Sequence, residues 1–343
     1  MASTAISATP RPNPLTVLRR TGAGPYLFIV ALTIVMFFVL GPRQFINALT
    51  IGAIYALVAL GYTMVYGIIE LINFAHGDVF MVGGFVSLFV LTNVLGQEGS
   101  ATSLEQIVFE LAVTFTLVMI AVGLLGVLIE RFAYRPLRNA PRLAPLITAI
   151  GISFILQNII QIIYGPSPIN TPQVIPPSAR VDIFGVSIGW INIFVIVIAV
   201  VLMIGLQLFV SRTKTGRAMR STASDREAAA LMGVDINRTI AITFLLGSAL
   251  AGAAGVVQGL YFGNIQFTLG FQAGLKAFTA AVLGGIGNLF GAAIGGFFIG
   301  FVEVTCAHFG YLAWAQAAVF GILIVTLVFR PAGLFGTQLG ERA

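Results

Sequence analysis

Long, uninterrupted apolar runs constrain this chain more than any other feature. Each run has about 20 residues, which is enough to cross a bilayer as a helix. The runs are continuous and do not alternate with polar residues, which argues against a β-barrel. The chain of 343 residues is 58% hydrophobic and only 9% charged, whereas soluble domains carry roughly 25% charged residues. Because such a chain cannot cover a water-facing surface, the sequence predicts an all-α, polytopic transmembrane bundle.

The order of the apolar runs predicts about eight crossings. Residues 26–40 are interpreted as a retained first helix and not as a signal peptide, because no small-residue cleavage site follows them. The block 273–306 is glycine-rich and too long for one straight crossing. It is predicted to form a broken or re-entrant hairpin that bends near residues 284–287. The other predicted crossings occupy residues 45–67, 75–95, 106–130, 143–164, 186–210, 239–262 and 310–329.

Basic residues orient these crossings. Fifteen of the 18 basic residues fall in the N-terminal tail, in two loops at 131–142 and 211–238, and near the C-terminus. Cytoplasmic loops carry such an excess of Lys and Arg, so both termini are predicted to be cytoplasmic. The bias also explains the net charge of +6 without nucleic acid as a partner. The predicted organisation is a cytoplasmic tail at 1–25, a single transmembrane domain at 26–335 and a cytoplasmic tail at 336–343.

The stretch Gly61–Asp78 places four polar side chains in otherwise apolar sequence. They are Glu70, Asn73, His76 and Asp78. Hydrocarbon solvates such groups badly, so they must face protein, water or a solute. One interpretation is that they cap helix ends at the cytoplasmic interface, which the topology supports. The other is that a helix break tucked into the bundle presents polar groups to a zwitterionic solute. The stretch is therefore a candidate hinge, inner gate or path.

Lys276 and Glu303 are further charges within the membrane segments, and Gly284, Gly285 and Gly287 mark the predicted bend. A packing salt bridge between Lys276 and Glu303 is one interpretation, and contact of Lys276 with a solute is the other. Paired glycines four residues apart typically let helices pack closely, although they can also line a pore with backbone. These pairs are 255/259, 291/295 and 296/300.

The loop at 211–238 contains signals for a short helix. Ser224 and Glu227 have the spacing of a capping box, in which each side chain satisfies a free amide at a helix start. Alanines follow, and Gly233 is suited to a left-handed C-terminal cap. The loop therefore predicts a short cytoplasmic helix with small surface residues. Such a helix is either an ordinary loop helix or a surface that a partner approaches closely.

Several classes of chemistry are excluded by what the chain lacks. Cys306 is the only cysteine, so no internal disulfide forms, and the two histidines lie far apart in sequence, which argues against a metal site. A phosphate-binding loop needs Gly-Lys-Ser/Thr, but Lys214 follows threonine and Lys276 follows leucine. No nucleophile and base pair stands out. The chain is therefore predicted not to be an enzyme, to hold no cofactor and to have no ATPase site of its own.

Four motifs carry a resemblance to a known family. Residues Glu227–Gly233 resemble the EAA loop of ATP-binding cassette (ABC) transporter permeases. Residues Gly61–Asp78, Glu130–Arg138 and Lys276–Gly287 resemble the LivH-type permease of high-affinity branched-chain amino acid transporters. The resemblance covers residues 45–335. It implies a permease domain at 26–335 whose loop at 211–238 couples to an ATPase. The coupling residues it implies are Arg217, Ser224, Glu227, Ala228, Ala229 and Gly233.

The resemblance also implies an assembly. The expected partners are a second, LivM-like permease, two ATP-binding subunits that consume ATP, and an extracytoplasmic substrate-binding protein. The implied activity is alternating-access import of leucine, isoleucine and valine across a bacterial inner membrane. One alternative is the same transporter class with urea, short amides or other amino acids as cargo. A second is a self-sufficient secondary transporter or channel.

Overall fold

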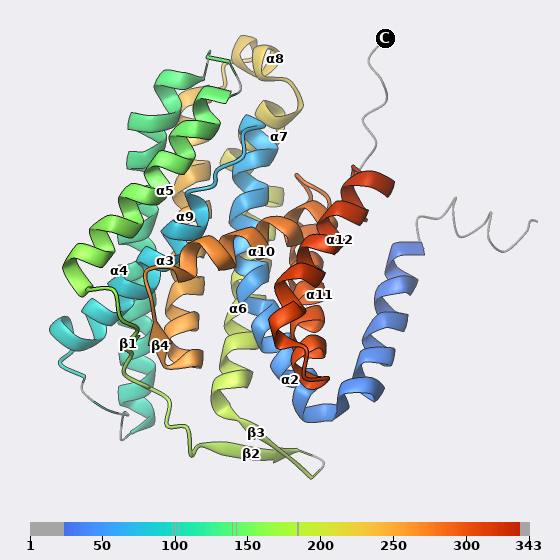
Figure 1. Cartoon of the computed structure of the whole chain (residues 1–343). Coiled ribbons are helices and arrows are strands. Elements are labelled where there is room, and N and C mark those ends of the chain that lie inside the picture. The colour runs from blue at the N-terminus through green and yellow to red at the C-terminus, as the bar shows by residue number, and fades with distance from the viewer. Residues whose placement is uncertain are drawn as a thin grey trace, which may run out of the picture.

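The computed structural model describes residues 24–97, 99, 101, 103–138, 140–141, 143–183 and 185–336. Residues 1–23 and 337–343, which make up most of the two predicted tails, lie outside the described residues. In the described part of the chain, eight helices are long and apolar enough to cross a membrane. The predicted polytopic helical bundle is confirmed (Figure 1).

The elements follow one another with short connections. The membrane-embedded helices are α2 (Gly24–Ile69), α3 (His76–Phe89), α4 (Leu104–Ile129), α5 (Leu143–Tyr164), α6 (Trp190–Arg212), α9 (Ile236–Phe262), α10 (Leu269–Gly284), α11 (Leu289–His308) and α12 (Ala315–Phe329). Short helical pieces are η1 (Val90–Val94), η2 (Glu130–Tyr134), η3 (Arg135–Leu137), α7 (Lys214–Ser224), α8 (Arg226–Leu231) and η4 (Leu312–Trp314). Two antiparallel strand pairs join β1 (Ile169–Asn170) to β4 (Asn264–Ile265), and β2 (Arg180–Ile183) to β3 (Val186–Gly189).

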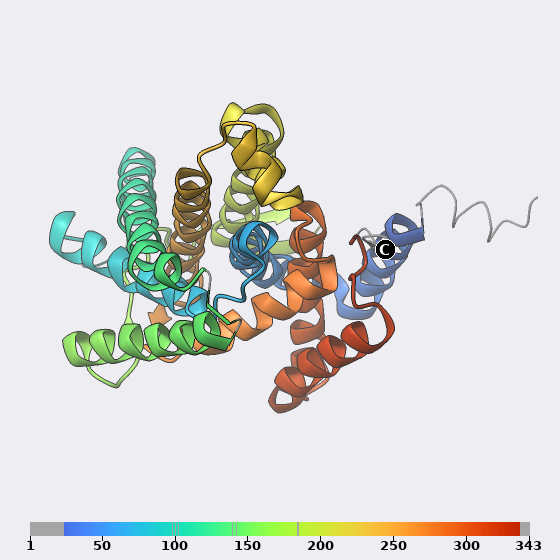
Figure 2. The same cartoon turned by 90° about the horizontal axis from the view of Figure 1, so that it is seen from above.

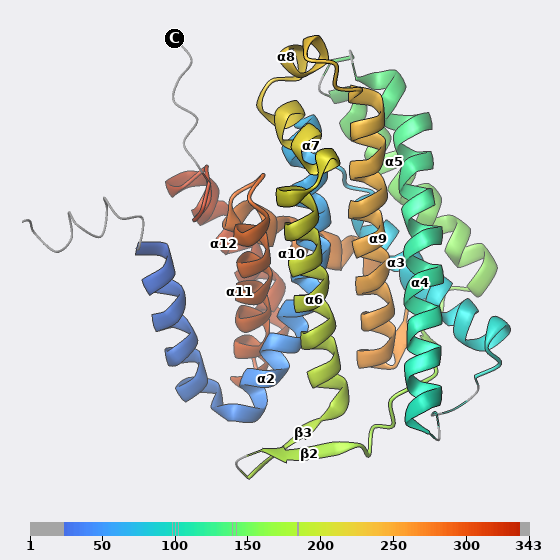
Figure 3. The same ribbon diagram turned by 180° about the vertical axis from the view of Figure 1, so that it is seen from behind.

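The bundle has two distinct ends. The β2–β3 hairpin lies at one end, here called the strand end, and α7 and α8 lie at the other, here called the α8 end (Figures 1 and 3). Helices α4 and α12 both run from the strand end to the α8 end. The basic segments that follow α4 and α12 are therefore gathered at the α8 end, together with those of α7 and α8.

Three of the predicted crossings are arranged differently in the structure. Helix α2 contains both of the first two predicted segments, with a sharp turn between them. The turn lies at Gly41, whose φ of 72° favours glycine, and Pro42 follows it. The predicted crossing 186–210 begins too early, because residues 186–189 pair as strand β3 and the helix starts at Trp190. Although α2 counts as a single span, the total is still eight, because α11 alone is long enough to cross.

The predicted hairpin at 273–306 is formed by α10 and α11, and its predicted bend is confirmed. Helix α10 ends at Gly284, and α11 begins after Asn288. With 16 residues, α10 is shorter than the about 20 residues that a full crossing needs. It starts in the middle of the bundle and runs obliquely across it, and α11 then returns to the strand end (Figure 1).

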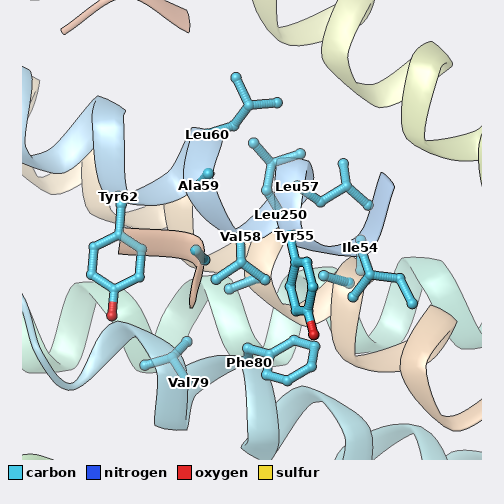
Figure 4. Close-up of a cluster of buried hydrophobic side chains, with 14 of the residues drawn as sticks. Ile54, Tyr55, Leu57, Val58, Ala59, Leu60, Tyr62, Val79, Phe80 and Leu250 are labelled. Atoms are coloured by element: carbon cyan, nitrogen blue, oxygen red, sulfur yellow. The ribbon is translucent and has the colours of Figure 1, made fainter. Parts of the chain in front are cut away.

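The core surrounds the second half of α2. Side chains of this helix interlock with Val79 and Phe80 of α3 and with Leu250 of α9 (Figure 4). Glycine permits the close approach of the helices, because a Cβ at Gly255 would overlap α3, one at Gly295 would overlap α10 and one at Gly300 would overlap α2. For these three glycines, the close-packing interpretation is confirmed.

Candidate functional site

A break between α2 and α3 carries the polar residues of the Gly61–Asp78 stretch. Helix α2 ends where Glu70 adopts a left-handed φ of 55°. The chain then turns back, and α3 begins partway through the bundle and not at its surface (Figure 1). Glu70 is exposed, whereas Asn73, His76 and Asp78 are buried. The interface interpretation therefore describes only Glu70, and the other three residues occupy a break tucked into the bundle.

Asn73 holds the start of α3 in place. Its side-chain oxygen accepts hydrogen bonds from the backbone N–H of Ala75 at 3.1 Å and from the hydroxyl of Tyr134 at 3.0 Å. Its carbonyl oxygen accepts the N–H of His76 at 3.1 Å. The break is therefore tied to η2 by a buried side-chain contact.

His76 packs as an aromatic ring. Its imidazole meets the ring of Tyr62 edge to face, with ring centroids 4.7 Å apart. Among the described residues, neither ring nitrogen has a partner within hydrogen-bond geometry, and its only polar interaction is a weak one with the backbone of Val58. These contacts place the imidazole in the packed core, with both ring nitrogens unpaired among the described residues.

Asp78 is held from the neighbouring helix α5. Its carboxylate accepts hydrogen bonds from the hydroxyl of Ser153 and, at 3.0 Å, from the side-chain amide of Gln157. The residue is 0% exposed. The ion pairs in the described part of the chain are Arg138–Glu130 and Lys276–Glu303, so Asp78 has no cationic partner there. An acid at this depth without a counter-ion marks a candidate functional centre.

The sequence did not single out Tyr134, Ser153 or Gln157. Isolated hydroxyls in apolar helices usually bond their own backbone, as Thr148 does to the carbonyl of Ala144. Ser153 does not, because it donates to Asp78. The spacing of Ser153 and Gln157 by four residues was an available signal, since it places both on one face of a helix.

Lys276 belongs to a separate polar cluster on α10. Its ammonium lies 2.8 Å from Glu303 and donates to the hydroxyl of Tyr55 at 3.1 Å. Tyr55 in turn donates to Glu303 at 2.6 Å. The predicted salt bridge is confirmed, and it joins α2, α10 and α11.

The glycines of the bend are packed against the C-terminal segment. Gly285 and Gly287 have positive φ angles of 104° and 89°. The N–H groups of Leu334 and Phe335 donate to the carbonyls of Leu283 and Gly284 at 2.8 and 3.1 Å. The bend is therefore fixed by backbone hydrogen bonds from residues that follow α12.

The predicted coupling residues all lie at the α8 end, but Ser224 does not have its predicted role. The residue that caps α8 is Asp225, whose carboxylate accepts the N–H of Ala228 at 2.9 Å. Ser224 is instead the last residue of α7. The predicted capping box of Ser224 and Glu227 is therefore wrong, because the residue directly before the first residue of α8 is Asp225 and not Ser224. Gly233 has a φ of 83°, so the predicted left-handed cap is confirmed.

Exposure divides the coupling residues further. Arg217, Ser224, Glu227, Ala228 and Gly233 are exposed, whereas Ala229 is buried. The tip of α8 also presents two apolar side chains that the sequence did not single out. Leu231 is 89% exposed and Met232 is 84% exposed. Apolar side chains so fully exposed outside the membrane helices are typical of a contact surface.

Helix α8 is linked to the broken segment by Arg226. Its guanidinium donates to the carbonyl of Ile68, in the last turn of α2, at 3.2 Å. Nearby, Arg138 pairs with Glu130 and donates to Asn237 at 2.6 Å. Burial lowers the pKa of the Arg138 guanidinium, and the Glu130 carboxylate opposes this shift. A polar cavity of about 580 Å³ lies between these groups, and the start of the break lines it.

Comparison with known proteins identifies the family. The family model described as branched-chain amino acid transport system / permease component matches residues 44–328. The chain is 42% identical over 303 residues to the high-affinity branched-chain amino acid transport system permease protein BraD of Pseudomonas aeruginosa, covering 88% of this chain and 97% of BraD. It is 40% identical over 306 residues to LivH of Escherichia coli (strain K12), a protein of the same description, with the same shares covered.

A more distant relative is a probable branched-chain amino acid transport permease protein, LivH of Methanocaldococcus jannaschii. It is 28% identical over 315 residues, covering 87% of this chain and 94% of the relative. No solved structure matches the chain. The match over nearly the full length agrees with the multi-pass bundle described above. The chain belongs to the family of permease components of branched-chain amino acid transport systems.

Proposed function

We propose that this chain is one membrane-spanning subunit of an ABC importer that carries leucine, isoleucine and valine across a bacterial inner membrane. The relatives named for branched-chain amino acid transport support the cargo. The physics is consistent with it, because an apolar side chain needs few charged contacts along its path. Energy comes from ATP that separate subunits consume, and the chain itself holds no cofactor.

The gathering of basic segments at the α8 end supports an orientation with that end in the cytoplasm. Both termini then lie in the cytoplasm. The strand end faces an extracytoplasmic substrate-binding protein, and the α8 end faces two ATP-binding subunits. A second, LivM-like permease completes the path.

The observation that carries the proposal is the exposed tip of α8, joined through Arg226 to the last turn of α2. Leu231 and Met232 enter a cleft of an ATP-binding subunit, where their apolar surface is covered. Closure of the ATPase pair displaces α8, and the Arg226 contact passes the movement to the break at 70–75. The two permeases thereby alternate between outward-facing and inward-facing states.

Transport by the complete assembly tests the cargo and the energy source. Proteoliposomes with both permeases, both ATP-binding subunits and the binding protein should accumulate labelled leucine and valine. They should do so only when ATP is present on the side of the membrane that the ATP-binding subunits face. Urea should neither be taken up nor compete. Failure of both leucine and valine to enter would reject the cargo. Ion-gradient uptake by vesicles without ATP-binding subunits would reject the ABC mechanism.

Charge reversal on α8 tests coupling. Glu227→Lys places a cation on the proposed docking surface, so leucine uptake should fall by about ten-fold or more, as expected when one charged interface contact is lost. Replacing Gly233 by a bulky residue should act likewise, because its φ of 83° suits glycine. Membrane insertion should not change. Glu105→Lys, an exposed reversal at the strand end, is the control. Normal uptake by both α8 variants would reject the coupling role.

A further inference from the structure

A cavity of about 650 Å³ opens between α5, α10 and the α2–α3 break. This volume lies within the roughly 300–1,000 Å³ range of small-molecule sites. Its polar wall is formed by Ser153 and Gln157 of α5, by Gln272 of α10 and by Thr268, which directly precedes α10. Its apolar wall includes Phe74 of the break and Phe154 of α5.

Hydrogen bonding to Asp78 orients the polar wall. An ionised carboxylate only accepts hydrogen bonds, so Ser153 must donate its hydroxyl and Gln157 its amide N–H. The Gln157 nitrogen also lies 3.3 Å from the oxygen of Ser153, to which it donates. The donors of both side chains are therefore engaged. What these two side chains leave for the cavity is the carbonyl oxygen of Gln157 and a lone pair of Ser153, and both are acceptors.

The charge of Asp78 favours a cation in this cavity. Asp78 has no cationic partner in the described part of the chain, and hydrocarbon around it gives little solvation. A positive group in the cavity would lie one side chain away from the carboxylate. An anionic group would be repelled by acceptors backed by an acid, and a neutral donor would gain a hydrogen bond without the charge attraction. The Ser153–Gln157 part of the polar wall therefore fits an ammonium group best.

The position of the cavity fits a transport path. Helices α3 and α10 both begin in the middle of the bundle (Figure 1), and discontinuous helices of this kind form midplane solute sites in transporters. Helices α5, α10 and α12 lie along one side of the molecule (Figure 2). On this side Gln272 is exposed at membrane depth, which is costly against lipid. This side is therefore suited to a water-filled path or a second permease.

We propose that this cavity holds the amino acid during translocation, with its ammonium group on Gln157 and Ser153 and its branched side chain against Phe74 and Phe154. Asp78 is a positioning residue that orients both acceptors and supplies negative charge. The assignment rests on the function proposed above, because it concerns the site at which that cargo passes.

Cavity size gives the first test, made with the complete transporter in proteoliposomes and saturating binding protein. Phe154→Trp fills the apolar wall, and because Phe154 is 59% exposed, the substitution does not disturb the core. Leucine is one methylene larger than valine, so the leucine-to-valine uptake ratio should fall by about ten-fold. Phe109→Trp, at an exposed site on α4 away from the cavity, is the matched control and should leave the ratio unchanged. An unchanged ratio in Phe154→Trp would overturn the assignment.

The polar wall gives the second test. Gln157→Leu removes the carbonyl acceptor of Gln157, so leucine uptake per ATP hydrolysed should fall by about ten-fold or more, as for a lost hydrogen bond to a charged group. Asn158→Leu is the control, because Asn158 is exposed and, among the described residues, its side chain bonds only the carbonyl of Phe154 in its own helix. Equal uptake per ATP in both variants would overturn the assignment. If the Gln157→Leu transporter does not assemble, the leucine-to-valine uptake ratio of Phe154→Trp decides whether the assignment stands. Wild-type transporter that carries neither amino acid would reject the proposed function itself, whereas active wild type with unaffected variants rejects only the cavity.

Discussion

Gly61 lies where α2 passes closest to the start of α3 and to α9. A Cβ built at this position would overlap the imidazole of His76 and would come within 2.7 Å of the carbonyl oxygen of Gly247. The neighbouring atoms on α9 are backbone and cannot rotate away. The absence of a side chain at Gly61 therefore lets α2 lie close to both the His76 ring and the backbone of α9.

Gly61→Ala should destabilise the protein by about 1–3 kcal/mol, the usual cost of overpacking a core. The thermal midpoint of the purified complex in detergent should fall by several degrees. Gly205→Ala is the matched control, because nothing lies within 4 Å of its added Cβ. The control should keep its midpoint or raise it slightly through helix propensity. Equal midpoints for the two variants would contradict the close packing.

The Lys276–Glu303 pair predicts non-additive substitutions. Their side chains are only 16% and 18% exposed, so removing one partner leaves the other charge poorly solvated. Lys276→Met and Glu303→Gln should each cost about 3 kcal/mol, and the double variant should cost less than the sum of the two. Denaturation midpoints of the four proteins give the coupling energy. If the two losses simply add, the two side chains stabilise the protein independently and not as an ion pair.

At the scale of elements, the short helix α8 depends on Asp225, the residue that directly precedes it. The six residues of α8 leave amide groups free at its start, and Asp225 satisfies that of Ala228. Its C-terminus is closed by the left-handed Gly233. A helix this short is marginal by itself, so its caps and the Arg226 contact to α2 hold it in place.

Asp225→Ala should weaken α8 by about 1 kcal/mol, a typical cost of losing an N-cap. Amide hydrogen exchange at Ala228 should then be about five-fold faster, the factor that corresponds to this energy. Ser224→Ala provides the comparison, because Ser224 ends α7 and does not cap α8. Faster exchange in Ser224→Ala than in Asp225→Ala would restore the capping box expected from the sequence.

At the scale of the whole molecule, aromatic residues mark one membrane boundary. The only two tryptophans of the chain, Trp190 and Trp314, are exposed and stand at the starts of α6 and α12. Both helices start at the strand end (Figures 1 and 3). Tryptophan concentrates at the interface between lipid and water. The strand end therefore reaches just beyond the hydrocarbon layer.

Thiol labelling tests the orientation of the bundle. In a Cys306→Ala background, a membrane-impermeant reagent added to right-side-out vesicles should label Ser187→Cys, which is exposed in β3. It should label Ser221→Cys, which is exposed on α7, only in inverted vesicles. The positive-inside distribution of charge is the physical reason. The opposite labelling pattern would reverse the assignment of the two ends.

The positions of most apolar spans, the bend at Gly284–Gly287 and the break after residue 69 were all predictable, because each is a local property of hydrophobicity or glycine content. The polar residues of the break were predictable for the same reason. Their partners were not. Asp78 meets Ser153 and Gln157 across 75 and 79 residues of chain, and Asn73 meets Tyr134 across 61. No local pattern specifies which helices meet.

The sequence by itself determined that this chain spans a membrane, which end carries the basic residues and which family it belongs to, because these depend on composition and on motifs along the chain. Only the tertiary structure decided that Glu70 is exposed while Asp78 is buried, eight residues later. The reason is that α3 restarts inside the bundle, and the solvation of a charge depends on the helices packed around it and not on its neighbours in sequence.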